Sequence, residues 1–258
     1  MRLAGRRALV TGGNSGIGYA IASAFVAEGA DVVITGTNEA KLEAALVGLE
    51  ASGRQVGVLR SDVADPEQCS ESVDEATRVL GGIDIVVNAA GIYISRRFGD
   101  YSTEEYRRLM AVNVDGPFHI CQAALPQMVD RGHGRIINIA SSAGKWASRN
   151  QAIYNMSKHA VIGLTRCLAL EYAASGVTAN ALCPGLVQTD MSDALERDQA
   201  DVTATTPEQI RNAMISRIAI GRYLQPEECG PLAVLLASDE SSGMTGQSIM
   251  VDGGMIFV

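Results

Sequence analysis

The sequence has few lysines, and its charge balance is acidic. Of its 21 basic residues only Lys41, Lys145 and Lys158 are lysines, and the formal net charge is -8. Nucleic acids and anionic membrane surfaces are bound by clustered positive charge, so we expect neither as a partner. We expect the partner to be a small-molecule substrate.

Closely spaced cysteines and long hydrophobic runs are also missing. The five cysteines are scattered along the chain, as is typical of reduced thiols in a cytosol rather than of a disulfide framework or zinc site. His119, His133 and His159 do not form a ligand set, so we predict no catalytic metal. No apolar run is long enough to cross a bilayer, and residues 1–7 lack the apolar core of a signal peptide, so we expect a cytoplasmic protein.

A glycine-rich segment, Thr11 to Gly18, connects a predicted strand at residues 7–11 to a predicted helix at residues 19–28. Glycines 12, 16 and 18 have no Cβ atom, so the turn can be tight and a pyrophosphate can approach the backbone N–H groups at the start of the helix. The segment therefore predicts a site for the phosphates of a dinucleotide. Taken alone, the spacing Gly-x-x-x-Gly-x-Gly also fits a plain structural turn.

Strand and helix patterns alternate along the rest of the chain. Further strands are predicted at residues 31–35, 55–59, 84–88, 134–140, 177–182 and 248–251, and helices at 41–52, 66–80, 102–130, 151–175, 207–217 and 226–237. Gly116-Pro117 predicts a break within 102–130, and residues 184–207 are expected to be irregular and polar. The alternation predicts one α/β domain over residues 1–258, with a doubly wound parallel sheet and helices on both faces.

Ligands bind doubly wound sheets beyond the carboxyl ends of the strands, so the residues that follow each strand are site candidates. These candidates are residues 12–18, 36–38, 62–63, 88–91, 141–142 and 184–185.

Tyr154 and Lys158 stand four residues apart in a predicted helix, which brings their side chains onto one face. A free tyrosine has a pKa of about 10, and a nearby ammonium together with an oxidised nicotinamide would lower that pKa toward neutrality. An ordinary amphipathic surface pair is the alternative. Ser141, just past a strand, favours catalysis because its hydroxyl could bond the substrate oxygen. Asn113 lies in an apolar helical segment, where an amide usually has a hydrogen-bonding task or caps a helix break.

Together these residues resemble the classical short-chain dehydrogenases/reductases. The resemblance runs from about Gly5 to Gly254 and rests on Thr11-Gly-x-x-x-Gly-x-Gly18, Asn88-Ala-Ala-Gly91, Asn113, Ser141, Tyr154-x-x-x-Lys158 and Pro184-Gly185. It implies a Rossmann-type sheet of about seven strands and hydride transfer between nicotinamide C4 and a carbonyl or alcohol carbon. It also implies that Tyr154 is the acid/base, that Lys158 lowers its pKa and holds the nicotinamide ribose, that Ser141 positions the substrate oxygen, and that Asn113 anchors a proton-relay water.

The resemblance also implies the cofactor contacts and a homotetramer built on the helices around residues 103–131 and 151–175. The cofactor-binding residues expected on this basis are Gly12, Asn14, Ser15, Gly16, Ile17, Gly18, Thr37, Asn38, Asp62, Val63, Asn88, Ala89, Gly91, Tyr154, Lys158, Pro184, Gly185, Val187 and Thr189.

The choice of cofactor depends on Gly36. NAD sites usually carry an acid there, about twenty residues after the glycines. Without a carboxylate a 2′-phosphate is not repelled, so we expect NADP(H), with NAD(H) as the alternative and with Thr37 and Asn38 as phosphate contacts. The basic residues that NADP-using relatives often carry are absent, because Ser15 and Thr37 stand at their positions.

Substrate contacts are expected from residues 93–97, 143–151 and 186–206, the last forming a mobile lid. Lys145, Trp146, Arg149 and Asn150 would suit a polar or acidic substrate, or form a solvated loop. The sequence resembles both 3-oxoacyl-carrier-protein reductases and polyol or 3-hydroxy-acid dehydrogenases, so the substrate stays open among 3-oxoacyl groups, hydroxy acids, polyols and ketones.

Two other functions are compatible with parts of these patterns. A non-catalytic nucleotide-sensing regulator on the same fold would carry a damaged Ser, Tyr, Lys set, and here the set is intact. An epimerase or dehydratase of the related extended family needs a larger C-terminal substrate domain than we expect after Pro184-Gly185. We therefore expect an oxidoreductase.

Overall fold

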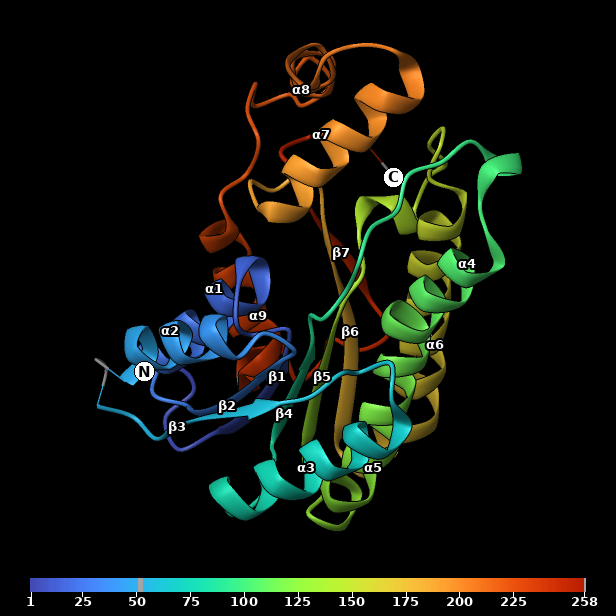
Figure 1. The fold of residues 1–258 in the computed structure, drawn as a ribbon. Helices are drawn as coiled ribbons and strands as arrows, with labels where there is room; N and C mark the ends of the chain where they lie inside the picture. The colour runs from blue at the N-terminus through green and yellow to red at the C-terminus, as the bar shows by residue number, and fades with distance from the viewer. Residues whose placement is uncertain (51–52, 258) are drawn as a thin grey trace.

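Seven parallel strands form one sheet in the order β3-β2-β1-β4-β5-β6-β7, in a computed structural model that describes residues 1–50 and 53–257 (Figure 1). The predicted fold class is confirmed, and the predicted helix 41–52 ends in two residues outside the described ranges. The strands are β1 (Arg7–Thr11), β2 (Asp31–Gly36), β3 (Val56–Arg60), β4 (Ile85–Asn88), β5 (Gly134–Ile139), β6 (Val177–Pro184) and β7 (Ser248–Val251).

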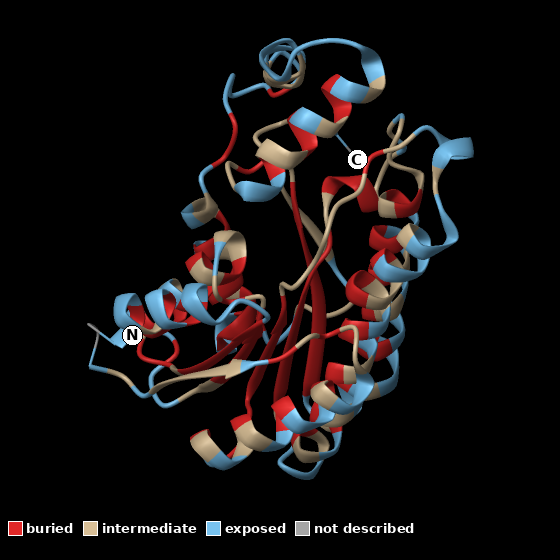
Figure 2. Ribbon diagram, viewed as in Figure 1, coloured by how far each residue is buried: buried red, intermediate tan, exposed pale blue. Residues whose placement is uncertain are grey.

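Both faces of the sheet are covered, which explains why the strands are apolar throughout. Successive side chains point to opposite faces, so Ala8 and Val10 of β1 belong to one core and Leu9 to the other. Figure 2 shows the buried residues concentrated on the strands and on the helix faces that meet them. The first core packs against α1 (Gly16–Ala27), α2 (Glu39–Glu50) and α9 (Gly230–Ala237), and the second against α3 (Pro66–Leu80), α5 (Gly116–Asp130) and α6 (Ala152–Tyr172).

Helix α3 has the bounds that the sequence predicted, because its ends are encoded locally. The Asp65 side chain accepts hydrogen bonds from the N–H groups of Glu67 and Gln68, and Pro66 occupies the first turn. Gly81 follows the helix with a φ of 75°, a left-handed conformation that favours glycine.

The predicted break at Gly116-Pro117 was wrong. Helix α4 (Thr103–Met110) continues through a π-helical turn (Ala111–Asp115) directly into α5. Pro117 lies in the first turn of α5, where a missing N–H does not interrupt the helix. The change of helical pitch, rather than a break, sets the position of Asn113.

The segment expected to be irregular contains helix α7 (Asp190–Thr203), which is followed by α8 (Pro207–Ile215). Thr189 and Ser192 form a reciprocal capping box at the start of α7, and Leu195 and Ala200 are buried. In Figure 1 both helices lie beyond the carboxyl ends of the strands. None of the helices in the described ranges is both long and apolar enough to cross a membrane.

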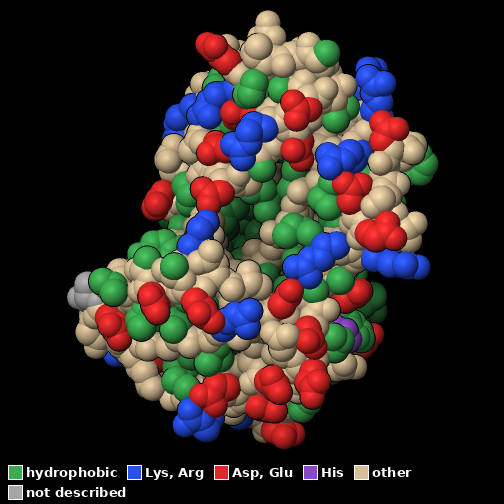
Figure 3. All heavy atoms as spheres, viewed as in Figure 1, with side chains coloured by type: hydrophobic (Ala, Val, Ile, Leu, Met, Phe, Trp, Pro, Cys, Tyr) green, Lys and Arg blue, Asp and Glu red, His purple; other side chains and the backbone are tan. Residues whose placement is uncertain are grey.

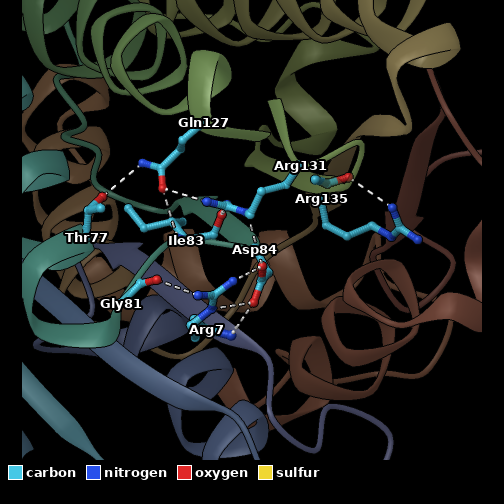
Figure 4. A network of polar contacts seen from close by, with 9 residues as sticks. Arg7, Thr77, Gly81, Ile83, Asp84, Gln127, Arg131 and Arg135 are labelled. Atoms are coloured by element: carbon cyan, nitrogen blue, oxygen red, sulfur yellow. Dashed lines mark hydrogen bonds and ion pairs between the residues drawn. The ribbon is translucent and has the colours of Figure 1, made fainter. Parts of the chain in front are cut away.

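The amino ends of β1 and β4 are joined by a polar network centred on Asp84 (Figure 4). The Arg7 guanidinium donates to both carboxylate oxygens of Asp84, at 2.7 and 2.8 Å, and Arg131 lies 3.8 Å away. Gln127 connects α5 to α3 by donating to Thr77 and accepting from the N–H of Ile83. Burial opposes ionisation, but Arg7 and Arg131 hold the pKa of Asp84 below its ordinary value.

Candidate active site

A cleft of about 600 Å³ lies at the carboxyl ends of the strands, where Figure 3 shows a hollow with hydrophobic side chains on its walls. The cleft is where the doubly wound sheet predicts a ligand. The expected site residues that line it are Gly12, Asn14, Ser15, Gly16, Ile17, Gly18, Thr37, Asp62, Val63, Ala89, Gly91, Ser141, Tyr154, Lys158, Pro184, Gly185, Val187 and Thr189. Asn38, Asn88 and Asn113 are not lining residues.

The glycine-rich turn packs as closely as the sequence predicted. A Cβ on Gly18 would lie 2.2 Å from the carbonyl oxygen of Gly12, so the start of α1 rests on the turn itself. Ser15 is the N-cap of α1, yet its side chain makes no capping hydrogen bond, in contrast to Asp65 of α3 and Ser102 of α4. The first N–H groups of α1 are therefore left for an anion in the cleft.

Thr11, which the sequence did not identify as a separate site residue, joins the turn to the segment after β4. Its Oγ1 accepts hydrogen bonds from the N–H groups of Ala89 and Ala90, at 3.2 and 3.3 Å. The sequence contained one indication of this role, because Thr11 is a polar residue at the end of an otherwise apolar strand.

Asn88, which we expected to border the cofactor, does not line the cleft. The Asn88 side chain is buried between the sheet and α5, where its amide donates to Asn138 at 2.8 Å and to the Sγ of Cys121 at 3.3 Å. The strand pleat explains this orientation, because Asn88 shares a face with Val86, which packs toward α5. Asn88 therefore fixes β4 to β5 and does not point into the cleft.

Thr37 and Asn38 were both predicted to contact a 2′-phosphate, but only Thr37 lines the cleft. The Asn38 side chain accepts from the N–H of Lys41 at 2.9 Å and so caps α2. Two arginines missed by the sequence lie near Thr37 instead: Arg60 at the end of β3 and Arg108 of α4 line a side cavity of about 280 Å³ with it. Arg60 pairs in register with Gly36, and Arg108 contacts Asp62 at 3.1 Å.

Tyr154, Lys158 and Ser141 meet at the centre of the cleft. The Lys158 ammonium lies 5.6 Å from the centre of the Tyr154 ring and donates to the carbonyl of Ile139 at 2.9 Å. Ser141 follows β5, accepts from the N–H of Ala143 at 3.1 Å, and acts on the Tyr154 phenol by lowering its pKa. The three residues therefore form one polar cluster in the cleft that the turn between β1 and α1 also lines.

In the protein without cofactor, burial dominates the pKa shifts of this cluster. Burial raises the pKa of the Tyr154 phenol, and the hydrogen bond with Ser141 acts in the opposite direction. Burial lowers the pKa of Lys158 to about 8. The Lys158 ammonium lies 5.6 Å from the centre of the Tyr154 ring while it is hydrogen-bonded to the Ile139 carbonyl.

Asn113 holds the loop after β4 against α6. Its side chain donates to the carbonyl of Ile92 at 3.0 Å and accepts from the N–H of the same residue at 2.9 Å. It also donates to Ser157, whose hydroxyl bonds the carbonyl of Tyr154. Asn113 is thus not the cap of a helix break, and it connects backbone groups on both sides of the cluster.

Asn155 is a positioning residue that the sequence did not reveal. Its amide donates to the carbonyls of Ala143 and Trp146 at 3.1 and 2.8 Å, and its oxygen accepts from Ser148 at 3.0 Å. The loop after β5 is therefore fixed by the residue that follows Tyr154. A polar residue on the buried side of a helix was the only signal in the sequence.

Some of the residues predicted to contact the substrate line the outer part of the cleft, and others do not. Tyr93 packs edge-on against Tyr154 with ring centres 5.2 Å apart and accepts from Gln199 of α7. Burial raises the pKa of Tyr93 to about 12. Trp146, Ser148 and Gln151 line the cleft, as do residues 186–192 and Leu195, whereas Lys145, Arg149 and residues 94–97 do not.

Comparisons with known proteins agree with this arrangement. A family profile described as enoyl-(acyl carrier protein) reductase matches residues 12–256. The D-beta-hydroxybutyrate dehydrogenase of Rhizobium meliloti (strain 1021) is 38% identical over 253 residues, covering 96% of this chain and 98% of that protein. An NAD+-bound xylitol dehydrogenase has a TM-score of 0.95 at 31% identity, covering 98% and 100% of the two chains. A Burkholderia cenocepacia J2315 gluconate 5-dehydrogenase in complex with NADP and tartrate has a TM-score of 0.90 at 36% identity, covering 98% and 96%.

Proposed function

The chain belongs to the classical short-chain dehydrogenase/reductase family, and we propose that Tyr154, Lys158, Ser141 and Asn113 are its catalytic residues. The protein is an NAD(P)-dependent oxidoreductase that interconverts alcohols and carbonyl compounds. The observation that carries the residue assignment is the cluster of Tyr154, Ser141 and Lys158 opposite a glycine turn whose helix start has no side-chain cap.

The residues of the cleft suit a dinucleotide. The glycine turn can bind the phosphates through the backbone N–H groups of α1, and Asp62 and Val63 can contact the adenine. When bound, the nicotinamide accepts a hydride from an alcohol carbon or, in reduced form, returns it to a carbonyl carbon. A Cβ on Gly91 would lie 3.7 Å from the Lys158 ammonium, so the segment after β4 leaves that ammonium open to the ribose hydroxyls.

Tyr154 then moves the proton that accompanies the hydride. In oxidation its phenolate takes the hydroxyl proton of the substrate, and in reduction its phenol donates a proton to the carbonyl oxygen. Ser141 donates a hydrogen bond to the same substrate oxygen, and the Lys158 ammonium favours the phenolate once the substrate side is closed. Asn113 does not line the cleft and its side chain is bonded to Ile92 and Ser157, so the proton-relay water that the family resemblance assigns to it stays a prediction.

The first prediction concerns a variant of Tyr154 that lacks the transferable proton. Tyr154→Phe keeps the packing of the ring, so we expect unchanged cofactor affinity and a loss of turnover of at least about 100-fold, the usual size of an acid–base contribution. Turnover is followed by nicotinamide absorbance on a panel of 3-hydroxybutyrate, gluconate, xylitol, neutral secondary alcohols and 3-oxoacyl thioesters. Tyr172→Phe, on the same helix outside the cleft, is the control. Full turnover by Tyr154→Phe would refute the assignment, and tight cofactor binding without turnover of any panel member by the wild type would favour the non-catalytic regulator.

We propose NADP(H) as the preferred cofactor, with Thr37, Arg60 and Arg108 beside its 2′-phosphate. The acid typical of NAD sites is absent because Gly36 stands at its position, and the register neighbour of Gly36 on β3 is a cation, Arg60. The ion pair of Arg60 with Glu39 is exposed and long, at 3.4 Å, so it is easily exchanged for a phosphate contact.

The second prediction tests this preference. Arg60→Ala should weaken NADP binding by about 2- to 5-fold, as expected for one exposed charged contact, and leave NAD binding unchanged. Calorimetric titration with each cofactor measures both affinities, and Arg78→Ala on α3 serves as the control. Equal effects on both cofactors, or a wild type that binds NAD more tightly, would contradict the proposal.

We also propose that the protein is cytoplasmic, that residues 1–258 form one catalytic domain, and that residues 186–206 form a lid.

We further propose a homotetramer. Four large apolar side chains on the helices expected at the subunit contacts are exposed: Tyr106, Phe118, Met156 and Leu170. Covering them would remove an apolar patch from water. Light scattering should give a mass four times 27.2 kDa, and a monomer would contradict the assembly.

A further inference from the structure

The charged side chains that line the cleft are paired, with one exception. Asp62 contacts Arg108 at 3.1 Å, Asp190 contacts Lys41 at 2.6 Å, and Lys158 donates to a backbone carbonyl. Arg217 also lines the cleft. Within residues 1–50 and 53–257 its guanidinium has no acidic partner and no hydrogen bond.

Arg217 is an exposed residue whose guanidinium stacks on an aromatic ring of the cleft wall. It follows α8, its backbone N–H donates to the carbonyl of Met214 at 3.1 Å, and its guanidinium lies over the Trp146 ring at 4.3 Å. The backbone carbonyl of Trp146 accepts a hydrogen bond from the amide of Asn155, the residue after Tyr154, at 2.8 Å. The loop segment that carries Trp146 is therefore tied to the helix of Tyr154, and Arg217 stacks on this segment through the Trp146 ring.

The stacking leaves the edge of the guanidinium available. A guanidinium on an aromatic face keeps its N–H groups in one plane, and this fork matches the two oxygens of a carboxylate. The net charge of -8 repels anions from the molecule as a whole, so an anionic substrate needs such a local cation. The neighbouring wall is apolar, with Leu195, Met214 and Met255.

We propose that the substrate is a hydroxy acid or its oxo acid, bound with its carboxylate on Arg217 and its hydroxyl or carbonyl oxygen on Ser141 and Tyr154. This substrate class rests on the proposed oxidoreductase function. Arg217 acts as the residue that distinguishes acids from neutral alcohols, and Trp146 holds it in position.

The test compares a hydroxy acid with its own methyl ester, which keeps the carbon skeleton and removes the charge. Wild-type kcat/KM should favour the acid, and Arg217→Gln should lower kcat/KM for the acid by about 10- to 100-fold while changing that for the ester less than about threefold. The hydroxy acid used in this comparison is the acid of the substrate panel that the wild type turns over fastest. The control is Arg222→Gln, an exposed arginine that pairs with Glu228 and does not line the cleft.

A binding readout keeps this inference separate from the proposed function. Malonate should stabilise the wild type in a thermal shift assay with oxidised cofactor, neutral malonamide should not, and Arg217→Gln should lose the malonate effect. Turnover of neutral alcohols but not of acids, or equal loss on acid and ester, would overturn the acid specificity and leave the oxidoreductase function intact. No turnover of any compound would contradict the oxidoreductase function, and malonate binding would still decide the role of Arg217.

Discussion

Lys158 is a cation that the fold keeps buried, with 5% of its surface exposed. Its pKa of about 8, against an ordinary value of 10.5, means that the folded state binds this proton less tightly than the unfolded chain does. The difference corresponds to about 3 kcal/mol of destabilisation at neutral pH. The residue is thus retained against its effect on stability, as expected for a group that serves catalysis.

The third prediction follows from this destabilisation. Lys158→Met has similar length and no charge, so we expect the free energy of unfolding at pH 7 to rise by about 1–2 kcal/mol after the lost hydrogen bond to Ile139 is subtracted. Turnover should be abolished. Stability of the wild type should increase as pH rises from about 8 toward 10.5, because in this range the unfolded state still holds the proton that the folded state has lost, and the variant should lack this increase. Urea unfolding at several pH values measures both effects, and a less stable variant at pH 7 would refute the explanation.

Individual site residues were predictable where their chemistry and position agree. Tyr154, Lys158 and Ser141 were placed correctly in the cleft because their spacing and strand-end position determine where they lie. Asn38 and Asn88 were not, since a strand-end position does not say which way a side chain points. The alternation along β4 would have directed Asn88 to the face of Val86, away from the cleft.

At the scale of elements, the start of α1 depends on Gly18. Any side chain there meets the carbonyl of Gly12, a backbone atom that cannot move without opening the turn. The fourth prediction is that Gly18→Ala lowers the free energy of unfolding by about 2–4 kcal/mol and weakens cofactor binding, because the strain falls on the phosphate turn. Gly163→Ala on α6 is the matched control, since a Cβ there meets nothing within 4 Å.

Gly163→Ala should instead be neutral or stabilising by up to about 1 kcal/mol, as alanine favours helix. Guanidinium unfolding and calorimetric titration measure stability and affinity for both variants. A fully stable Gly18→Ala with normal cofactor affinity would show that the turn tolerates expansion.

Elements were predictable where their ends are encoded by nearby residues. Asp65, Pro66 and Gly81 delimit α3 without help from the rest of the fold. Helix α7 was missed because its cap uses Ser192 where a capping box usually has Glu or Gln, and because its buried side includes Glu196 and Gln199. Those polar residues are satisfied by Arg211 and by Tyr93, contacts that only the tertiary structure supplies.

On the scale of the whole molecule, the two ends of the sheet have different tasks. The carboxyl end carries the cleft, and the amino end carries the Asp84 network that joins β1, β4, α3 and α5. Such a division lets residues at the amino end be changed without altering the chemistry.

The fifth prediction uses this division. Asp84→Asn leaves Arg7 and Arg131 without their carboxylate, so we expect a loss of about 2–4 kcal/mol at pH 7 with unchanged KM values for the folded enzyme. Because the pKa of Asp84 is lowered in the folded state, its contribution is present above about 4 and is lost as pH falls through the folded-state pKa, where wild type and variant should converge. Asp74→Asn, an exposed acid on α3, is the control. Unfolding curves that stay apart at the lowest pH would contradict this account.

Trp146 is the single tryptophan of the chain and lies within the cleft under Arg217. The tryptophan fluorescence of the protein therefore originates in the cleft, with no second indole contributing to the signal. Quenching of this emission on adding ligand gives an affinity without any label, and energy transfer to a reduced nicotinamide would report how near the two rings come.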